Sequence, residues 1–301
     1  MSGREPPSYR LVGIVLATAG VVGFSFRPVL VKLAYAYVAD PVTMIALRMI
    51  FSLPFFVAAA WWTRGGGTPI ARRDWLAVLF LGFLGYYAAS YLDFLGLQYI
   101  SAGLARLLLF AYPTIVVLLS AAFLKKPVRR REAAALALTY LGLFLVLWHA
   151  LGGVSRDAPL GVTLVFASAV CYAVYLVVGS QVIGRVGSAR FTAYAMTIAS
   201  GLVIAQFLLL RPLSALALPP PVYGYAIAMA LGSTVLPVFM TSEALKRIGA
   251  NHVAIIGAVG PVTTILFGWI GLEETMTALQ IGGAALVLVG VILVSLRPAK
   301  S

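Results

Sequence analysis

The sequence predicts an all-α integral membrane protein in which ten transmembrane helices form two inverted five-helix repeats. Three observations lead to this fold class. The 301-residue chain is 62% hydrophobic and only 10% charged, whereas soluble domains are about 25% charged. The stretch 101–126 recurs 148 positions later as 249–274. Most Lys and Arg residues lie in alternate breaks between the apolar runs, as expected of a chain that crosses a membrane repeatedly.

Ten segments are long and apolar enough to span a bilayer, which takes about 20 residues. They are roughly 11–35, 42–62, 75–98, 102–124, 132–150, 159–182, 190–210, 223–245, 251–270 and 278–296. The breaks at 98–101 and 246–251 depend on only a few polar residues and a glycine. A continuous helix over 75–124 would be about 75 Å long, far beyond a hydrocarbon core of about 30 Å. We therefore expect two helices there.

The two copies of the repeated stretch show the same features in the same order. Each begins with a small residue and an alanine, continues as a long apolar run with one proline, Pro113 or Pro261, and meets a charged pair after a leucine. The pair is two lysines (125–126) in the first copy and two glutamates (273–274) in the second. Opposite charges at equivalent ends indicate that the copies cross the membrane in opposite directions.

The distribution of charge predicts the topology. With the N-terminus in the cytoplasm, the cytoplasmic segments hold most of the 22 Lys and Arg residues, while the outer loops hold only Arg156 and Arg211. Ten spans return the C-terminus to the cytoplasm, so we expect a multi-pass protein of the cell inner membrane with both termini inside. Since each half has five helices, the second half enters from the opposite face. Such inverted pairs recur in secondary transporters.

The order of these features resembles the two EamA-type repeats of the drug/metabolite transporter superfamily. The resemblance covers essentially the whole chain, as repeats 1–150 and 151–301. The second copy matches through Gly271-Leu272-Glu273, whereas the first has lysines where the family often has Gly-Glu. The resemblance implies a central cavity lined mainly by helices 1 to 4 and 6 to 9. It also implies a gradient-driven carrier that exports or exchanges small organic metabolites, such as amino acids or related amphiphiles, by alternating access.

Charged residues within or near the ends of the predicted spans are the first candidates for a substrate pathway, because charges are costly in lipid and face the protein interior by default. They are Arg27, Lys32, Arg48, Asp93, Arg106 and Glu243. Helical rise places all of them except Glu243 in the outer third of the membrane. We expect Asp93 to neutralise one arginine and the surplus positive charge to attract a substrate anion. The alternative is that Lys32, Arg48 and Arg106 are structural.

Asp93 and Glu243 are candidates for coupling transport to protons, because they lie at nearly equivalent positions of the two repeats, close to opposite membrane surfaces. The competing interpretation for Glu243 is an ion pair with Lys246 or Arg247 one turn further on. Arg27 is the strongest anion-site candidate. It precedes Pro28, which removes one backbone hydrogen bond and exposes a carbonyl within the span.

Aromatic and hydroxyl residues extend the predicted pathway. Tyr86, Ser90 and Asp93 share one face of helix 3, and Tyr172 and Tyr175 share one face of helix 6. Phe24 occupies the position equivalent to Tyr172 in the first repeat. Core packing is the alternative for each of these residues. The matched prolines, Pro113 and Pro261, are hinge candidates, with static kinks as the alternative.

The sequence predicts no cofactor and no metal site. It has no phosphate-binding GxxxxGK[ST] motif, a single cysteine, Cys171, and two isolated histidines, His149 and His252. We expect the lipid bilayer and a small-molecule substrate as partners, no nucleic acid, and leave a homodimer open. The main alternative function is a membrane-embedded enzyme acting on lipid-linked substrates, which would need a convergent acid, base or metal set. An ion channel or scaffold subunit is a third.

Overall fold

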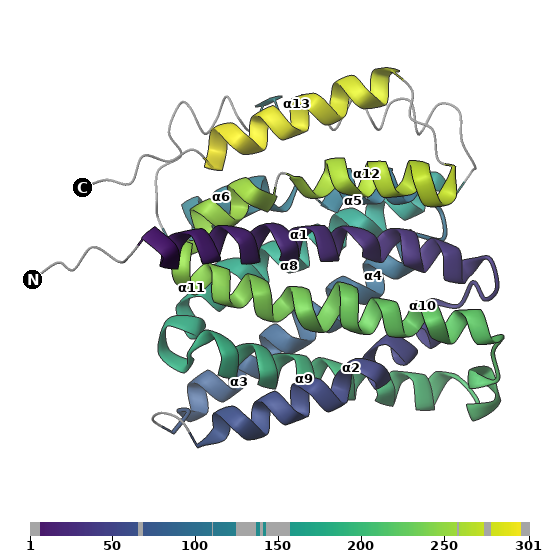
Figure 1. The fold of residues 1–301 in the computed structure, drawn as a ribbon, viewed down its shortest axis with the longest axis horizontal. Helices are drawn as coiled ribbons and strands as arrows, with labels where there is room; N and C mark the ends of the chain where they lie inside the picture. The colour runs from purple at the N-terminus through teal and green to yellow at the C-terminus, as the bar shows by residue number, and fades with distance from the viewer. Residues whose placement is uncertain are drawn as a thin grey trace, which may run out of the picture.

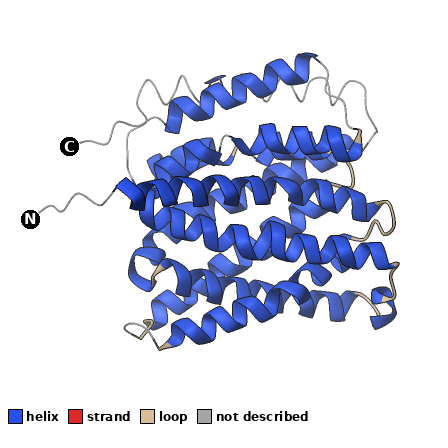
Figure 2. Cartoon of the chain, viewed as in Figure 1, coloured by secondary structure: helices blue, strands red, loops and turns tan. Residues whose placement is uncertain are grey.

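The structure, a computed structural model, describes residues 7–65, 69–109, 111–124, 137–138, 141–142, 157–257, 259–273 and 278–295. All regular elements in these ranges are helices, packed side by side into a single bundle (Figure 2). Within these described ranges, six helices are long and apolar enough to cross a membrane, and they correspond to predicted spans 1 to 3 and 6 to 8. The all-α membrane fold is thereby confirmed. The predicted fifth span lies almost wholly outside the described residues.

The first half begins with two long helices and a composite third. Its elements are α1 (Pro7–Tyr35), α2 (Pro41–Arg64), α3 (Arg72–Leu81), η1 (Gly82–Ala88), α4 (Ala89–Gly96), α5 (Ala102–Leu109) and α6 (Tyr112–Leu124). α3, η1 and α4 follow one another without a break and form a single span. α4 ends at Gly96 and α5 begins at Ala102, so the weak break predicted at 98–101 is present.

The second half repeats this pattern. Its elements are α8 (Ala158–Val186), α9 (Ser188–Leu210), η2 (Leu213–Leu216), α10 (Pro220–Ala230), η3 (Leu231–Val235), α11 (Leu236–Gly257), α12 (Val259–Leu272) and α13 (Ala278–Ser295). α13 packs on α6 and α11 at the margin of the bundle (Figure 1). α1 begins and α13 ends at the same end of the bundle (Figure 1). We call this the N-terminal end.

α1 lies between α11 and α12 (Figure 1). Its contacts with these two helices establish the direction in which each of them runs. Gly13 lies against Ile248 and Gly20 lies against Thr241. The residue numbers rise on α1 while they fall on α11, so these two helices are antiparallel. The glycines allow this approach, because a Cβ at Gly20 would lie 2.7 Å from the Thr241 hydroxyl.

α12 runs in the opposite direction to α11. Ser25 on α1 donates a hydrogen bond to the carbonyl of Gly260 (3.1 Å), and Val29, one turn on, lies against Gly271. Because α12 is therefore parallel to α1, the chain reverses between Ile248 and Gly260. The reversal of direction before α12 agrees with the prediction, but the predicted break at 246–251 is wrong, because α11 is helical from Leu236 to Gly257 and no proline interrupts its hydrogen bonds there.

Two π-helical segments mark the repeat in the backbone itself. η1 covers Gly82–Ala88 in the third span, and η3 covers Leu231–Val235 in the eighth. Shifting 82–88 by the repeat offset of 148 gives 230–236, which contains the whole of η3. Single-turn π segments inside α-helices are rare and are frequently found at functional sites. Their recurrence at equivalent positions shows that the two halves share local geometry as well as helix order.

The halves pack on each other through equivalent helices. α3, η1 and α4 pack on α8 and α9, while α10, η3 and α11 pack on α1 and α2, and α2 and α9 pack together. Glycines permit the closest contacts, since a Cβ at Gly82 would lie 2.8 Å from the Ala195 carbonyl and one at Gly85 would overlap the Tyr175 ring. The first and second halves therefore meet along the third and eighth spans, where the π segments lie.

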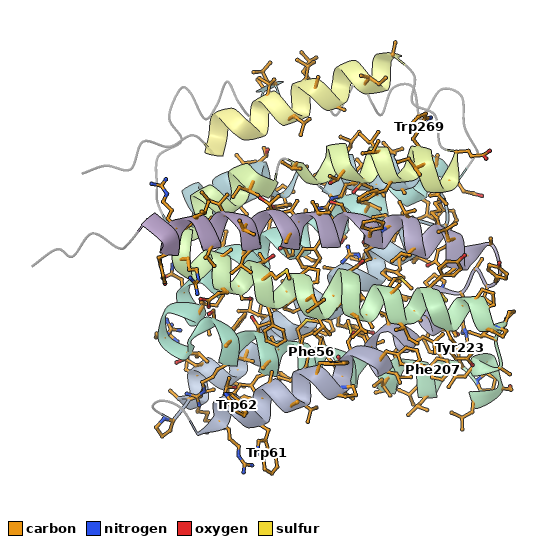
Figure 3. The ribbon with its side chains drawn as sticks, in the orientation of Figure 1. Phe56, Trp61, Trp62, Phe207, Tyr223 and Trp269 are labelled. Carbon is orange, nitrogen blue, oxygen red and sulfur yellow. The ribbon has the colours of Figure 1, made fainter. Side chains whose placement is uncertain are left out.

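The side chains separate a packed interior from an apolar exterior. Phe56 and Phe207 are fully buried, whereas Trp61, Trp62 and Trp269 point away from the bundle (Figure 3). Trp62 is 87% exposed near the end of α2, and the guanidinium of Arg64 lies 3.8 Å from the Trp61 ring centre. Exposed tryptophans beside arginine at helix ends are typical of membrane interfaces.

Candidate functional site

A buried ion pair links α1 to α4. Arg27 Nη2 lies 2.6 Å from Asp93 Oδ2, and the two side chains are 15% and 3% exposed. Arg27 lies in the second half of α1, next to Pro28 within the helix. Asp93 lies close to the end of the third span, at the same end of the bundle. The sequence predicted that Asp93 neutralises one arginine, and in the structure that arginine is Arg27.

Arg48 lies on α2, in the first two turns, and is only 1% exposed. Its guanidinium carbon is 4.9 Å from the centre of the Phe94 ring, next to Asp93 on α4. Its Nε and Nη2 atoms donate no hydrogen bond within the described part of the chain. The Asp93 carboxylate and the face of the Phe94 ring stabilise this buried charge, whereas burial and the neighbouring charge of Arg27 oppose it.

Arg106 on α5 lies against the second half of the chain. A Cβ at Gly260 on α12 would lie 2.7 Å from Arg106 Nη2, so the guanidinium occupies space that only a glycine leaves free. Its buried Nε has no hydrogen-bond partner among the described residues. Arg106 also interacts electrostatically with Tyr112 and Tyr172. Arg106 therefore contacts both repeats.

We call Arg27, Arg48, Arg106 and Asp93 the arginine cluster. Arg27 is its centre, since it pairs with Asp93 and interacts electrostatically with both Arg48 and Arg106. Three guanidinium groups and one carboxylate give these four residues a net charge of +2. The predicted grouping is present for these four, while Lys32 lies in the last turn of α1.

A column of tyrosines continues from the cluster. Tyr112 packs edge-on against Tyr172, with ring centres 5.0 Å apart, and Tyr172 stacks on Tyr175 at 5.7 Å. The hydroxyls of Tyr175 and Tyr86 are 2.8 Å apart. Phe191 ends the series, 6.0 Å from Tyr175. We call these five residues the tyrosine column, which is built from both halves.

The remaining predicted pathway residues lie close by. Phe24 is half-buried against the main core, and Ser90 is buried on α4. Sequence reasoning missed Ser25, whose hydroxyl accepts a hydrogen bond from Thr263 (2.9 Å) and whose carbonyl accepts one from Thr264 (3.1 Å). It missed Tyr112 and Gly260 as well. For Tyr112 the available signal was its place between Arg106 and the matched proline.

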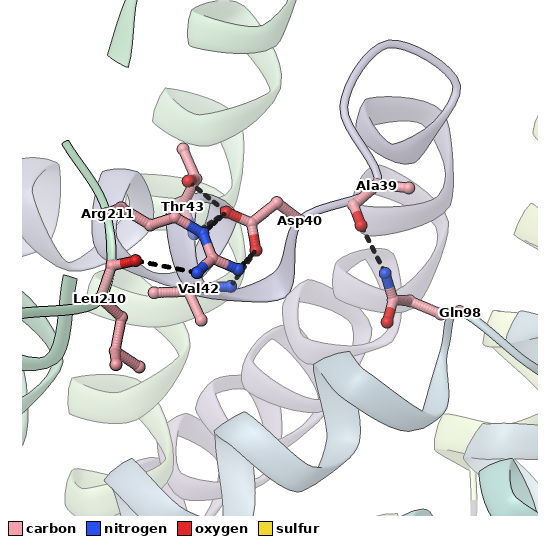
Figure 4. A network of polar contacts seen from close by, with 7 residues as sticks. All are labelled: Ala39, Asp40, Val42, Thr43, Gln98, Leu210 and Arg211. Carbon is pink, nitrogen blue, oxygen red and sulfur yellow. Dashed lines mark hydrogen bonds and ion pairs between the residues drawn. The ribbon is translucent and has the colours of Figure 1, made fainter. Parts of the chain in front are cut away.

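An ion pair links the two halves at the end of the bundle opposite the N-terminal end. Asp40 caps α2 and accepts hydrogen bonds from Arg211 Nε (2.9 Å) and Nη2 (3.0 Å), while Thr43 adds its hydroxyl (Figure 4). Gln98 donates to the Ala39 carbonyl beside it (Figure 4). Burial alone would raise the pKa of Asp40, but the hydrogen bonds from Arg211 and Thr43 outweigh it and hold this pKa below its usual value.

A second ion pair between the halves lies at the N-terminal end. Arg185, in the last turn of α8, donates from Nη2 and Nε to Asp74 Oδ1 at 2.6 and 3.0 Å. Trp75, next in sequence, packs on Tyr194 of α9 with ring centres 4.9 Å apart. Each end of the bundle therefore has one carboxylate of the first half bound to one arginine of the second.

The two coupling candidates have different surroundings. Asp93 is buried and paired across helices, whereas Glu243 pairs with Arg247 one turn away on the same helix, at 2.7 Å. Glu243 thus has the local partner that the alternative interpretation expected. Its side chain is 37% exposed.

The matched prolines lie at the starts of helices. Pro113 is the second residue of α6 and Pro261 the third residue of α12. α5 ends at Leu109 and α6 begins at Tyr112, with Ala111 described as a turn just before Pro113.

Comparisons with known proteins agree with this architecture. The chain is 28% identical over 299 residues to the uncharacterized transporter YcbK of Bacillus subtilis, covering 96% of this chain and 95% of that protein. It is 29% identical over 217 residues to the threonine/homoserine exporter RhtA of Salmonella typhimurium, covering 70% and 68%. A solved crystal structure shares the fold, with a TM-score of 0.67, 19% identity and 95% coverage of both chains.

The repeated architecture is also what the family comparison recognises. The sequence model of the EamA-like transporter family matches the chain twice, over residues 11–148 and again over residues 159–296. The two matches have equal length and cover most of the sequence, one in each half. From this match and the shared fold, the chain belongs to the EamA-like transporter family.

Proposed function

We propose that the protein is a secondary transporter that exports or exchanges small organic metabolites, amino acids or related amphiphiles, by alternating access. The observation that carries this proposal is the meeting of buried polar groups from both halves. The arginine cluster comes from the first half, and it is continued by the tyrosine column, which includes Tyr172 and Tyr175 of the second. The name of the RhtA relative supports small amino acids as one substrate class to test.

The proposed pathway consists of Phe24, Arg27, Arg48, Tyr86, Ser90, Asp93, Arg106, Tyr172 and Tyr175. In alternating access, repeats 1–150 and 151–301 rock against each other around this site. The Asp40–Arg211 and Asp74–Arg185 pairs lie at opposite ends and both cross between the halves. Each mouth opens when its own pair separates. Asp93 and Glu243 remain candidates for proton coupling, with Pro113 and Pro261 as hinges.

We place the protein in the cell inner membrane with both termini cytoplasmic. The charge distribution of the loops supports this orientation, since Arg64, Arg72 and Arg73 lie at the N-terminal end of the bundle with the start of α1. In this orientation the Asp40–Arg211 pair closes the outer mouth and the Asp74–Arg185 pair the inner one.

Counterflow in proteoliposomes tests the proposal. Vesicles loaded with one unlabelled metabolite from a panel are diluted into the labelled form, and a carrier produces transient, saturable accumulation of label. A channel would equilibrate the label without overshoot, and an enzyme acting on lipid-linked substrates would form a product. Absence of counterflow for every metabolite, with protein correctly inserted, contradicts the proposal.

A further inference from the structure

The charge balance of the arginine cluster constrains what the site binds. Asp93 is the only carboxylate among the four residues, and its side chain is 3% exposed and already bound to Arg27. Arg48 and Arg106 share no further acidic partner among the described residues. The site therefore presents surplus positive charge to a substrate and no free carboxylate for a substrate ammonium group.

A zwitterionic amino acid fits this site poorly. Its carboxylate gains from Arg106, but its ammonium group, only two bonds from the carboxyl carbon, would lie near the same guanidinium with no acceptor of its own. Like charges placed together in a poorly hydrated site repel strongly. The tyrosine rings offer a cation–π surface, yet two of them, Tyr112 and Tyr172, already interact electrostatically with the positive charge of Arg106. A substrate without the ammonium charge avoids this penalty.

Arg106 is the group best placed to hold a substrate carboxylate. Arg27 Nη2 is bound to Asp93, although its buried Nε, like that of Arg106, has no hydrogen-bond partner among the described residues, and Arg48 is only 1% exposed. Arg106 is less buried than Arg48, has a buried Nε that donates no hydrogen bond to the described residues, and rests on the backbone of Gly260. The adjoining tyrosine column supplies ring faces for an apolar body and hydroxyl groups for polar substituents.

From these observations we propose that the preferred substrate is an organic anion, a carboxylate whose amino group is absent or blocked, and that Arg106 binds its carboxylate against Gly260. This inference rests on the proposed transport function and narrows its substrate class. N-acyl amino acids and 2-oxo acids are the chemical types concerned. Because Arg106 belongs to the first half and Gly260 to the second, an anion held there contacts the boundary between the repeats.

The test compares ligands that share a side chain and differ only at the amino group. Purified protein in nanodiscs is titrated with phenylalanine, N-acetylphenylalanine and phenylpyruvate, and binding is measured by thermal shift and by calorimetry. The wild type is expected to bind the two anions about tenfold or more tighter than the zwitterion. Equal or tighter binding of phenylalanine overturns the inference.

Three variants locate the effect. Arg106→Gln is expected to remove the preference for the anions, and Gly260→Ala to weaken it by displacing the guanidinium without changing the charge. Arg64→Gln removes an equivalent charge at the exposed end of α2 and is the matched control. Retention of the full preference in both Arg106→Gln and Gly260→Ala overturns the assignment to Arg106. If either variant fails to fold, the other variant and the wild-type ligand series still test whether Arg106 binds the anion.

Counterflow with the same ligands separates this inference from the proposed function. If phenylalanine exchanges while N-acetylphenylalanine and phenylpyruvate neither bind nor compete, the transport function stands and the anion preference is wrong. If the anions bind tightly but no metabolite shows counterflow, the binding inference stands and the transport function is wrong.

Discussion

The substitution Asp93→Asn should destabilise the protein strongly. It removes the only carboxylate of the arginine cluster and raises the net charge of those four positions from +2 to +3. The lost pair has a 2.6 Å contact and side-chain exposures of 15% and 3%, so solvent screens it little. Removing one partner of a buried ion pair costs about 3–5 kcal/mol, because the other charge is left uncompensated. We expect a loss of this size in the free energy of unfolding.

Titration with SDS in mixed micelles, followed by circular dichroism, measures this free energy. The double variant Arg27→Met/Asp93→Asn returns the net charge to +2 and should recover most of the loss. Glu243→Gln is the control, since it breaks an ion pair within one helix whose glutamate is 37% exposed. Such pairs contribute only about 0.3–0.5 kcal/mol. The reasoning fails if Asp93→Asn costs no more than Glu243→Gln, or if the double variant is as unstable as Asp93→Asn.

Two further predictions concern the contacts between the halves. Gly85→Ala should cost about 1–3 kcal/mol in the same titration, because the added methyl overlaps the Tyr175 ring; Gly201→Ala, which meets no atom within 4 Å, should cost nothing, and equal effects would contradict the argument. The Asp40–Arg211 pair should stabilise the protein above pH of about 4, the usual pKa of an unfolded aspartate, and lose this effect as the pH falls through the lowered folded-state pKa of Asp40. The stability gap between wild type and Asp40→Asn should therefore close in acid, and a gap that widens there would refute it.

Much of the fold could be predicted from the sequence, because a chain that crosses a membrane repeatedly needs long apolar segments separated by charged loops. Apolar length fixes the spans, and the charges between them fix their directions. The repeat offset of 148 also relates the two π segments, which hydropathy alone does not reveal. The predicted break at 246–251 shows the limit of this approach. The chain reverses between Ile248 and Gly260, but α11 continues as a helix through 246–251 to Gly257, so a few polar residues and a glycine did not mark the end of the helix.

The candidate site was predicted less completely, for a physical reason. Charged residues in an apolar span stand out, so Arg27, Arg48, Asp93 and Arg106 were found and the structure brings them together. Gly260 could not be found, because its importance is the absence of a side chain opposite Arg106. A contact of that kind depends on how two helices pack, and nothing in the sequence of α12 records it.

The ion pairs at the two ends were missed for a related reason. Four charged residues at the ends of spans form these pairs: Asp40, Arg211, Asp74 and Arg185. Charged residues are common at span ends, so their presence there does not indicate an ion pair. Only the packing of the halves shows that each pair crosses between them. Because both pairs are present in the same structure, neither end of the bundle has lost its link between the repeats.

The two repeats share the order of their helices but differ in the side chains at the positions of the arginine cluster. At the offset of 148, Arg27 matches Tyr175, Arg48 matches Met196, and Asp93 matches Thr241. The two halves therefore do not carry two equivalent charged clusters. They carry one charged cluster, in the first half, set against the tyrosines and Gly260 of the second. In the alternating access proposed above, the two halves exchange their shapes, and this exchange turns the one cluster toward either face of the membrane.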